Sequence, residues 1–149
     1  MLQGVKLGNF GAFFRRADRE NDYLWGRLHA ADRLIDLVYD ARPAGISFEA
    51  ANPRHAHEWA VFMEHPLPDD KVIYPGVIDS TTNFIEHPLL VAERICRFAD
   101  IVGRERVIAG TDCGFATFAG FGAVDADVVY AKLGALVEGA GIASARLWT

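Results

Sequence analysis

The chain has 149 residues, of which 51% are hydrophobic and 23% charged, with a formal net charge of −5. This is the composition of a globular protein with enough residues for one domain and a substantial core. The acidic balance, without a basic tract, argues against a nucleic-acid partner. No apolar run approaches the roughly 20 residues of a membrane span, and the first residues lack the apolar core of a signal peptide. We therefore expect a cytoplasmic protein without a membrane partner, in which Cys96 and Cys113 are free thiols.

The N-terminal part of the chain divides into an irregular stretch and a helix. Residues 1–23 contain scattered glycines and a charged run, and we expect a poorly ordered N-terminal segment there. Apolar residues then recur at steps of four and three, which is typical of one face of a helix: Leu24, Leu28, Ala31, Ile35 and Val38. Arg42-Pro43 ends this helix, because the residue before a proline avoids the helical conformation.

From Ala44 onward, a short apolar strand followed by a helix occurs three times. The expected strands are residues 44–49, 71–79 (interrupted by Pro75-Gly76) and 106–110. The expected helices start at Asn52-Pro53, His87-Pro88 and Asp125, and run to about Glu64, Gly103 and Ala145. In the last two helices we expect these residues to face inward: Val91, Ile95, Phe98 and Val102, then Val129, Leu133, Leu136 and Ala140. The alternation predicts an α/β fold with a parallel sheet covered by helices.

Polar residues follow each expected strand: Glu49, Asp79 and the pair Asp112-Cys113. The carboxyl ends of parallel strands are where α/β barrels and open sheets build their sites. Capping of the following helices is the alternative explanation for these residues. Because a complete eight-stranded barrel takes about 250 residues, three or four strands indicate either the last part of a barrel or a small open sheet.

Three segments carry a family resemblance: ISFEAANPRHAHEW, PGVIDSTTNFIEHP and VIAGTDCGFATFAG. They resemble the C-terminal catalytic barrel of cobalamin-independent methionine synthase, and most of all its short bacterial relatives, which include coenzyme M transferases. The resemblance covers about residues 28–148. It implies that residues 24–149 are the last three to four βα units of a TIM barrel, and that the N-terminal half, with most homocysteine and folate contacts, lies outside this chain.

The resemblance also implies a zinc site. The family holds zinc with a His-x-Cys pair, a glutamate and a cysteine; the glutamate falls on Glu49 and the last cysteine on Cys113. The zinc activates the homocysteine thiol, whose thiolate takes a methyl group from methyltetrahydrofolate. Zinc suits this reaction because it has no redox chemistry, binds sulfur and lowers the pKa of a thiol that is otherwise about 8.5.

The chain departs from the family at two places. If Gly8-Asn9 matches the Gly-Asn that follows the family's His-x-Cys pair, the ligand positions are Gly4 and Lys6, neither of which binds zinc usefully. Alternatively, residues 1–23 are unrelated to the family fold. Thr81 stands where the full-length synthases carry a histidine.

The remaining polar residues admit two interpretations. Asp79 and Asp112 are candidate catalytic residues, Asp112 by orienting Cys113, but backbone hydrogen bonding is an equal alternative for both. His55 and His57 lie two apart on an expected helix and so point to different faces, which argues against a shared metal. Cys96 is expected to be a core or interface residue.

The resulting hypothesis is a zinc-dependent transferase of methionine biosynthesis, with homocysteine and 5-methyltetrahydrofolate as substrates and Zn²⁺ as cofactor. This chain alone is expected to be inactive or to need a partner. Open strand edges predict self-association or pairing with the missing barrel half. A zinc-dependent coenzyme M transferase on the same scaffold, or a non-catalytic fragment or assembly partner, are the alternatives.

Overall fold

The computed structural model describes residues 16–116 and 124–149. The chain divides into two compact units, Met1–Arg42 and Pro43–Thr149, which we call unit 1 and unit 2. The aligned ligand positions Gly4 and Lys6 lie outside the described residues, as does most of the glycine-rich stretch after Cys113.

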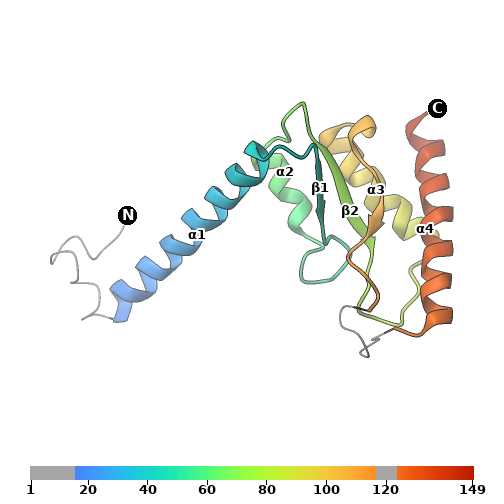
Figure 1. Cartoon of the computed structure of the whole chain (residues 1–149), viewed down its shortest axis with the longest axis horizontal. Coiled ribbons are helices and arrows are strands. Elements are labelled where there is room, and N and C mark those ends of the chain that lie inside the picture. Colours follow the sequence, from blue (N-terminus) through green and yellow to red (C-terminus); the bar gives the residue numbers. More distant parts are fainter. Residues whose placement is uncertain (1–15, 117–123) are drawn as a thin grey trace. The chain divides into compact units, whose positions relative to one another are not determined.

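Unit 1 contains one described helix, α1 (Arg16–Asp40), which Figure 1 draws in blue. The helix ends just before Arg42-Pro43, as predicted. It starts earlier than predicted, since residues 16–23 are helical and not irregular. Their arginine, alanine and glutamate residues favour a helix by propensity alone, without an apolar repeat to reveal it.

Unit 2 contains a parallel sheet of three strands in the order β1-β2-β3, with β1 at Gly45–Phe48, β2 at Val72–Ile78 and β3 at Gly110–Thr111. Neighbours in the chain are neighbours in the sheet, as in successive βα units of a barrel. The predicted α/β fold with a parallel sheet is therefore confirmed.

Two strand predictions are wrong in detail. β2 is continuous through Pro75-Gly76, and only its pairing with β3 shifts, between Gly76 and Ile78. The strand expected at 106–110 is reduced to an isolated bridge between Ile73 and Val107, followed by the short β3. Pro75 pairs with Phe48, the last residue of β1, so the proline lies where the ladder between β1 and β2 ends.

The helices of unit 2 are α2 (Val61–Glu64), α3 (Pro88–Val102) and α4 (Ala126–Leu147), with short 3-10 turns at Glu58–Ala60 and Arg104–Arg106. α3 is capped as predicted: the His87 side chain accepts the Leu89 N–H, and Gly103 ends the helix at a φ of 96°. The helix predicted from Asn52-Pro53 is wrong over its first half, because residues 53–57 form turns and only the end is helical.

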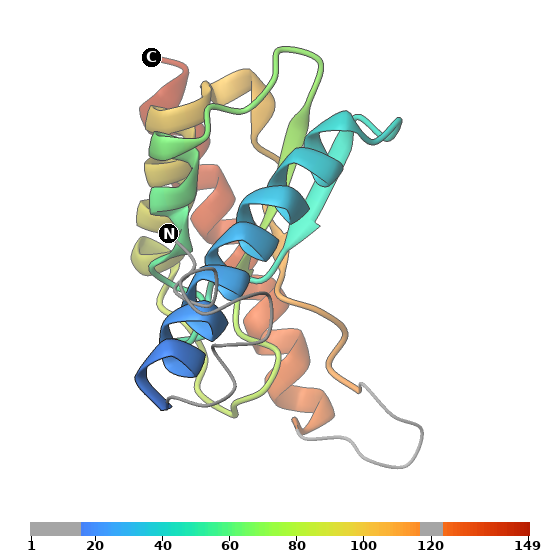
Figure 2. The same ribbon diagram turned by 90° about the vertical axis from the view of Figure 1, so that its left-hand side faces the viewer.

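The core of unit 2 lies between β2, α3 and α4, and consists of Val77, Ile78, Val91, Ala92, Ile95 and Ala143. The predicted inward face of α3 is confirmed in full. Phe48, Phe62 and Phe98 form a second cluster, with ring centroids 5.4–6.1 Å apart, that joins β1, α2 and α3. Figure 2 shows α2 and α3 side by side on one side of the strands.

The inward face predicted for α4 is confirmed in part: Leu136 and Ala140 pack against the core of unit 2, but the most buried positions lie about one residue earlier around the helix. The buried residues are Lys132, Ala135, Gly139 and Ala143, whereas Leu133 is 37% exposed. The reason is the close approach of α3: a Cβ atom on Gly139 would lie 2.5 Å from Cβ of Val91. By length and composition alone α4 is also apolar enough to cross a membrane, which core helices commonly are, so the expectation of no membrane partner stays a prediction.

Candidate functional site

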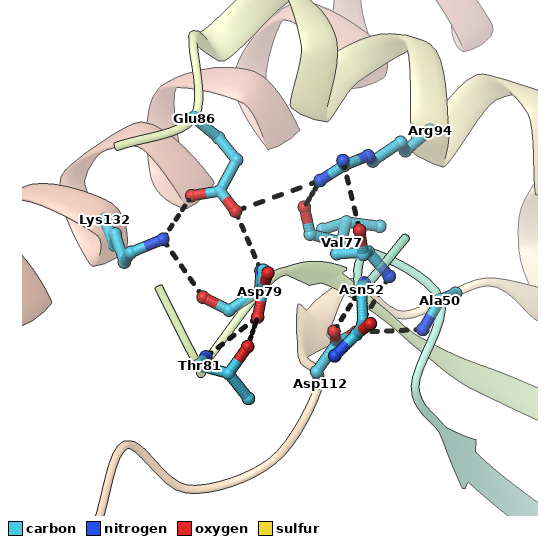
Figure 3. A network of polar contacts seen from close by, with 10 residues as sticks. Ala50, Asn52, Val77, Asp79, Thr81, Glu86, Arg94, Asp112 and Lys132 are labelled. Atoms are coloured by element: carbon cyan, nitrogen blue, oxygen red, sulfur yellow. Dashed lines mark hydrogen bonds and ion pairs between the residues drawn. The ribbon is translucent and has the colours of Figure 1, made fainter. Parts of the chain in front are cut away.

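The predicted site residues lie at one edge of the sheet. Glu49 follows β1, Asp79 follows β2, and Asp112 and Cys113 follow β3. Because the three strands are parallel and adjacent, their carboxyl ends form a common edge. We call this the carboxyl edge, and Figure 3 shows the polar contacts around two of its residues, Asp79 and Asp112.

Asp112 joins the end of β3 to the segment after β1. Its Oδ1 accepts the N–H groups of Ala50 and Ala51 at 2.8 and 2.9 Å, and its Oδ2 accepts the N–H of Asn52 at 2.8 Å. Burial raises the pKa of Asp112, against the opposing effect of these hydrogen bonds. With three backbone donors on its carboxylate, Asp112 fixes the main chain that carries Glu49.

The close approach of Asp112 requires glycine at position 76 of β2. A Cβ atom on Gly76 would lie 2.2 Å from Oδ1 of Asp112 and 2.5 Å from its Cα. Such distances exceed any ordinary packing adjustment. A side chain at position 76 would collide with Asp112, so the absence of one at Gly76 lets the Asp112 carboxylate reach the segment after β1. In the sequence, the same glycine looked like a strand breaker.

Asp79 closes a turn at the end of β2. Its Oδ1 accepts both the N–H and the hydroxyl of Thr81, at 2.8 and 2.7 Å. Thr81 therefore donates two hydrogen bonds to the same carboxylate oxygen of Asp79. This is an Asx-type turn, which holds the loop in a fixed conformation.

The sequence did not reveal the buried ion pair that supports this loop. Lys132 of α4 is fully buried, and its Nζ donates to Glu86 Oε2 at 2.9 Å and to the Asp79 carbonyl at 3.0 Å. Glu86 Oε1 in turn accepts the Asp79 N–H at 2.8 Å. Arg94 donates to the Val77 carbonyl at 2.8 Å and lies 4.0 Å from Glu86. A lysine among the apolar residues of the first half of α4 is the signal that could have indicated this pair.

Cys113 lies against the loop after β2. Its Sγ is 2.8 Å from the hydroxyl oxygen of Ser80, which is buried, while Cys113 itself is partly exposed. This contact brings the ends of β2 and β3 together at the carboxyl edge. Cys96, by contrast, packs against the core of unit 2, as predicted.

Glu49 belongs to an exposed group on the other side of the carboxyl edge. Its Oε2 lies 3.6 Å from Nε2 of His55, whose Nδ1 is 3.0 Å from Oε1 of Glu58. The hydrogen bond to Glu58 raises the pKa of His55, and the charge of Glu49 adds to the effect. His55 therefore lies between two carboxylates.

The residues described in unit 2 do not amount to a zinc site. Within residues 16–116 and 124–149, no group of three or more His, Cys, Asp or Glu side chains is placed to hold a metal ion. The sequence of residues 1–15 and 117–123 contains none of these four types. Zinc needs three or four protein ligands, so the carboxyl edge offers two candidates, Glu49 and Cys113, and any further ligand has to come from elsewhere.

A mostly apolar cavity of about 370 Å³ lies between the segment after Cys113 and the first turns of α4. Its lining consists of Phe115, Ala116, Val124, Ala126, Val129, Tyr130 and Leu133. It adjoins the end of β3 and adds an apolar surface beside the polar groups.

Comparison with solved structures defines the class of fold. A B12-independent methionine synthase from Shewanella sp. W3-18-1, solved in complex with selenomethionine, superposes with a TM-score of 0.62 and 24% identity, over 74% of this chain and 29% of that one. The predicted resemblance to the methionine synthase barrel is confirmed at the level of the fold.

Sequence comparison adds two curated relatives and a family. The chain is 34% identical over 120 residues to 2-hydroxypropyl-CoM lyase of Xanthobacter autotrophicus, a match over 79% of this chain and 30% of the lyase. It is 36% identical over 62 residues to the uncharacterized membrane protein Rv3479 of Mycobacterium tuberculosis, 39% of this chain and 6% of that protein. A family model described as a protein of unknown function (DUF3376) matches residues 1–88, and the chain belongs to this family.

The match to the lyase includes the carboxyl edge. An alignment of 120 residues in a chain of 149 has to contain the middle of the chain, where Glu49, Asp79, Asp112 and Cys113 lie. The chain spans less than a third of the length of the lyase. The part of the lyase that this chain matches therefore includes the segments that form the carboxyl edge.

Proposed function

We propose that unit 2 contributes the carboxyl edge of a barrel that transfers a carbon group to or from a thiol. The observation that carries the proposal is the common edge formed by Glu49, Asp79, Asp112 and Cys113, in a segment 34% identical to a coenzyme M lyase. Glu49 and Cys113 are the proposed zinc ligands of this chain, to be completed by other protein groups.

The described residues have distinct roles in this proposal. Asp112 and Asp79 hold the segments after β1 and β2, because their carboxylates accept backbone N–H groups of those segments. Cys113 and Glu49 are more exposed and are the groups that would meet a metal or a thiol substrate. We derive no reaction step through zinc, since the described residues of unit 2 do not supply a complete ligand set.

Two reactions are candidates. The first is methyl transfer from 5-methyltetrahydrofolate to homocysteine, in line with the methionine synthase fold. The second is cleavage or formation of a coenzyme M thioether. Thr81 favours the second, because it donates twice to Asp79 where a synthase would place a histidine for proton transfer.

The experiment compares both reactions in the purified full chain supplied with zinc, alone and mixed with a protein that carries the missing half of the barrel. One assay follows methionine formation from homocysteine and 5-methyltetrahydrofolate, and the other follows release of free thiol from 2-hydroxypropyl-coenzyme M. Turnover should be lost in Cys113→Ser and kept in the matched control Cys96→Ser, because Cys96 packs in the core. Equal turnover in wild type and Cys113→Ser would contradict the proposal. A chain that turns over neither substrate would favour the non-catalytic assembly partner.

A further inference from the structure

Ser80 is a buried polar residue to which the proposed function gives no role. It directly follows Asp79 at the end of β2 and is only 3% exposed. Its hydroxyl oxygen lies 2.8 Å from Sγ of Cys113, which is partly exposed. At the carboxyl edge, a buried hydroxyl therefore meets the sulfur that is proposed to bind a metal or a thiol substrate.

The main chain next to Ser80 is held at several points, which Figure 3 shows. Glu86 accepts the Asp79 N–H at 2.8 Å, and the buried Lys132 donates to the Asp79 carbonyl at 3.0 Å. On the other side of Ser80, the N–H and the hydroxyl of Thr81 both donate to Asp79 Oδ1. The Ser80 hydroxyl is therefore carried by a turn whose conformation is fixed by a buried ion pair and by an Asx-type turn.

The main chain next to Cys113 is held independently of Ser80. The hydroxyl of Thr111 donates to the Cys113 carbonyl at 3.1 Å, and the Asp112 N–H donates to the Ile78 carbonyl at 2.9 Å. The contact between the Ser80 and Cys113 side chains therefore determines where the sulfur points, since other hydrogen bonds already determine where the chain runs.

The direction of this hydrogen bond follows from the second contact of the sulfur. Sγ of Cys113 also lies 3.5 Å from the Gly114 carbonyl oxygen, which can only accept a hydrogen bond. The thiol proton is therefore directed to Gly114, and the sulfur accepts from the Ser80 hydroxyl. A thiolate has no proton to donate, so the hydroxyl is also the donor when the sulfur is charged. A hydrogen bond to a charged acceptor is stronger than one between neutral groups.

We propose that Ser80 is a positioning residue for Cys113: its hydroxyl donates to Sγ, holds the sulfur in one orientation and stabilises its negative charge. Groups behind a metal ligand orient the ligand and tune its electrons in this way. The proposal rests on the proposed function, because it concerns the sulfur that acts there. It gives the turn after β2 a part in the chemistry of the residue that follows β3.

The test uses cobalt(II) as a spectroscopic probe of the sulfur in the full chain. A hydrogen bond to a thiolate lowers the energy of the sulfur electrons, so charge transfer from that thiolate to cobalt absorbs at a shorter wavelength. Ser80→Ala should therefore move the charge-transfer band to longer wavelength and raise the cobalt dissociation constant about tenfold. The matched control Thr111→Val removes a hydroxyl that donates to the carbonyl of the same cysteine, and should leave the band in place.

The outcomes separate the role of Ser80 from the proposed function. The absence of a thiolate band in the wild-type chain at saturating cobalt would contradict both. A band at the same wavelength in the wild type and in Ser80→Ala would keep Cys113 as a ligand but overturn the role of Ser80. Equal shifts in Ser80→Ala and Thr111→Val would show a general loosening of the carboxyl edge, and would overturn that role as well.

A double-mutant cycle tests the contact without any metal. Urea denaturation is measured for the metal-free chain with Ser80→Ala, with Cys113→Ala and with both substitutions. Because each single substitution already removes the contact, the two single losses of stability should add up to more than the loss in the double variant. Additive losses would mean that the two side chains do not interact, and would overturn the proposal.

Discussion

The carboxyl edge of unit 2 has a buried side and an exposed side that differ in how their charges are satisfied. On the buried side, Asp79 and Asp112 are about 6–7% exposed, and backbone donors occupy their carboxylates. On the exposed side, Glu49 is 38% exposed and faces only His55 among the ion pairs. The buried acids therefore build the edge, whereas the exposed groups are the ones free to exchange partners.

The largest expected effect follows from breaking the buried ion pair. Lys132→Met should lower the free energy of unfolding by about 4 kcal/mol, because it leaves Glu86 buried without its cation. Urea denaturation measures the change. The double variant with Glu86→Gln should recover much of the loss, and a loss below about 1 kcal/mol in Lys132→Met would contradict the account.

The next effect tests the space that Asp112 occupies. Gly76→Ala should cost about 3 kcal/mol, since its Cβ would meet backbone as well as carboxylate atoms of Asp112. Gly134→Ala is the matched control: no atom lies within 4 Å of its Cβ, and it should stabilise α4 by up to about 1 kcal/mol. Similar changes in both variants would show that the close approach at Gly76 is not a constraint.

A smaller effect is expected from Asp112→Asn. The amide offers one acceptor oxygen, and its NH₂ group has to face a backbone N–H, so a loss of about 2 kcal/mol follows. Asp79→Asn should cost less than about 1 kcal/mol, because a single oxygen of Asp79 accepts both bonds from Thr81. Thermal or chemical denaturation of the two variants measures both losses. A larger loss in Asp79→Asn than in Asp112→Asn would contradict the roles assigned to the two aspartates.

The smallest effect concerns the exposed side. In an NMR titration of the metal-free full chain, Glu58→Gln should lower the pKa of His55, since the hydrogen bond to Glu58 is the main cause of the raised value. The protonated ion pair stabilises the fold below the ordinary pKa of about 6.5, and this contribution is lost as the pH rises through the raised folded value. An unchanged pKa in Glu58→Gln would assign the shift to Glu49.

Much of the fold could be predicted from the sequence, where local signals agree with the packing. Pro88 at the start of α3 and Gly103 after it define its ends, and its apolar spacing gives the buried face. The strand ends also place Glu49, Asp79 and Cys113 at one edge without any knowledge of contacts. These features depend on residues close together in the chain.

The remaining features depend on distant residues and could not be read locally. The buried face of α4 is determined by Lys132 and Gly139. Lys132 is buried because its charge pairs with Glu86 in the loop after β2, and Gly139 is buried because α3 approaches too closely for a side chain. Gly76 looks like a strand breaker until Asp112 is placed beside it. The roles of the four predicted site residues in chemistry stay predictions, since hydrogen bonds show what holds them and not what they bind.

The most direct test of the central claim is cobalt binding, read by absorption. Cobalt(II) takes zinc-type ligands, and a cysteine thiolate bound to it produces an intense near-ultraviolet charge-transfer band. The account predicts this band in the full chain and in Cys96→Ser, its weakening in Glu49→Gln, and its loss in Cys113→Ser. A band that persists in Cys113→Ser, or no band in the wild-type chain at saturating cobalt, would contradict the assignment of Cys113 as a metal ligand at the carboxyl edge.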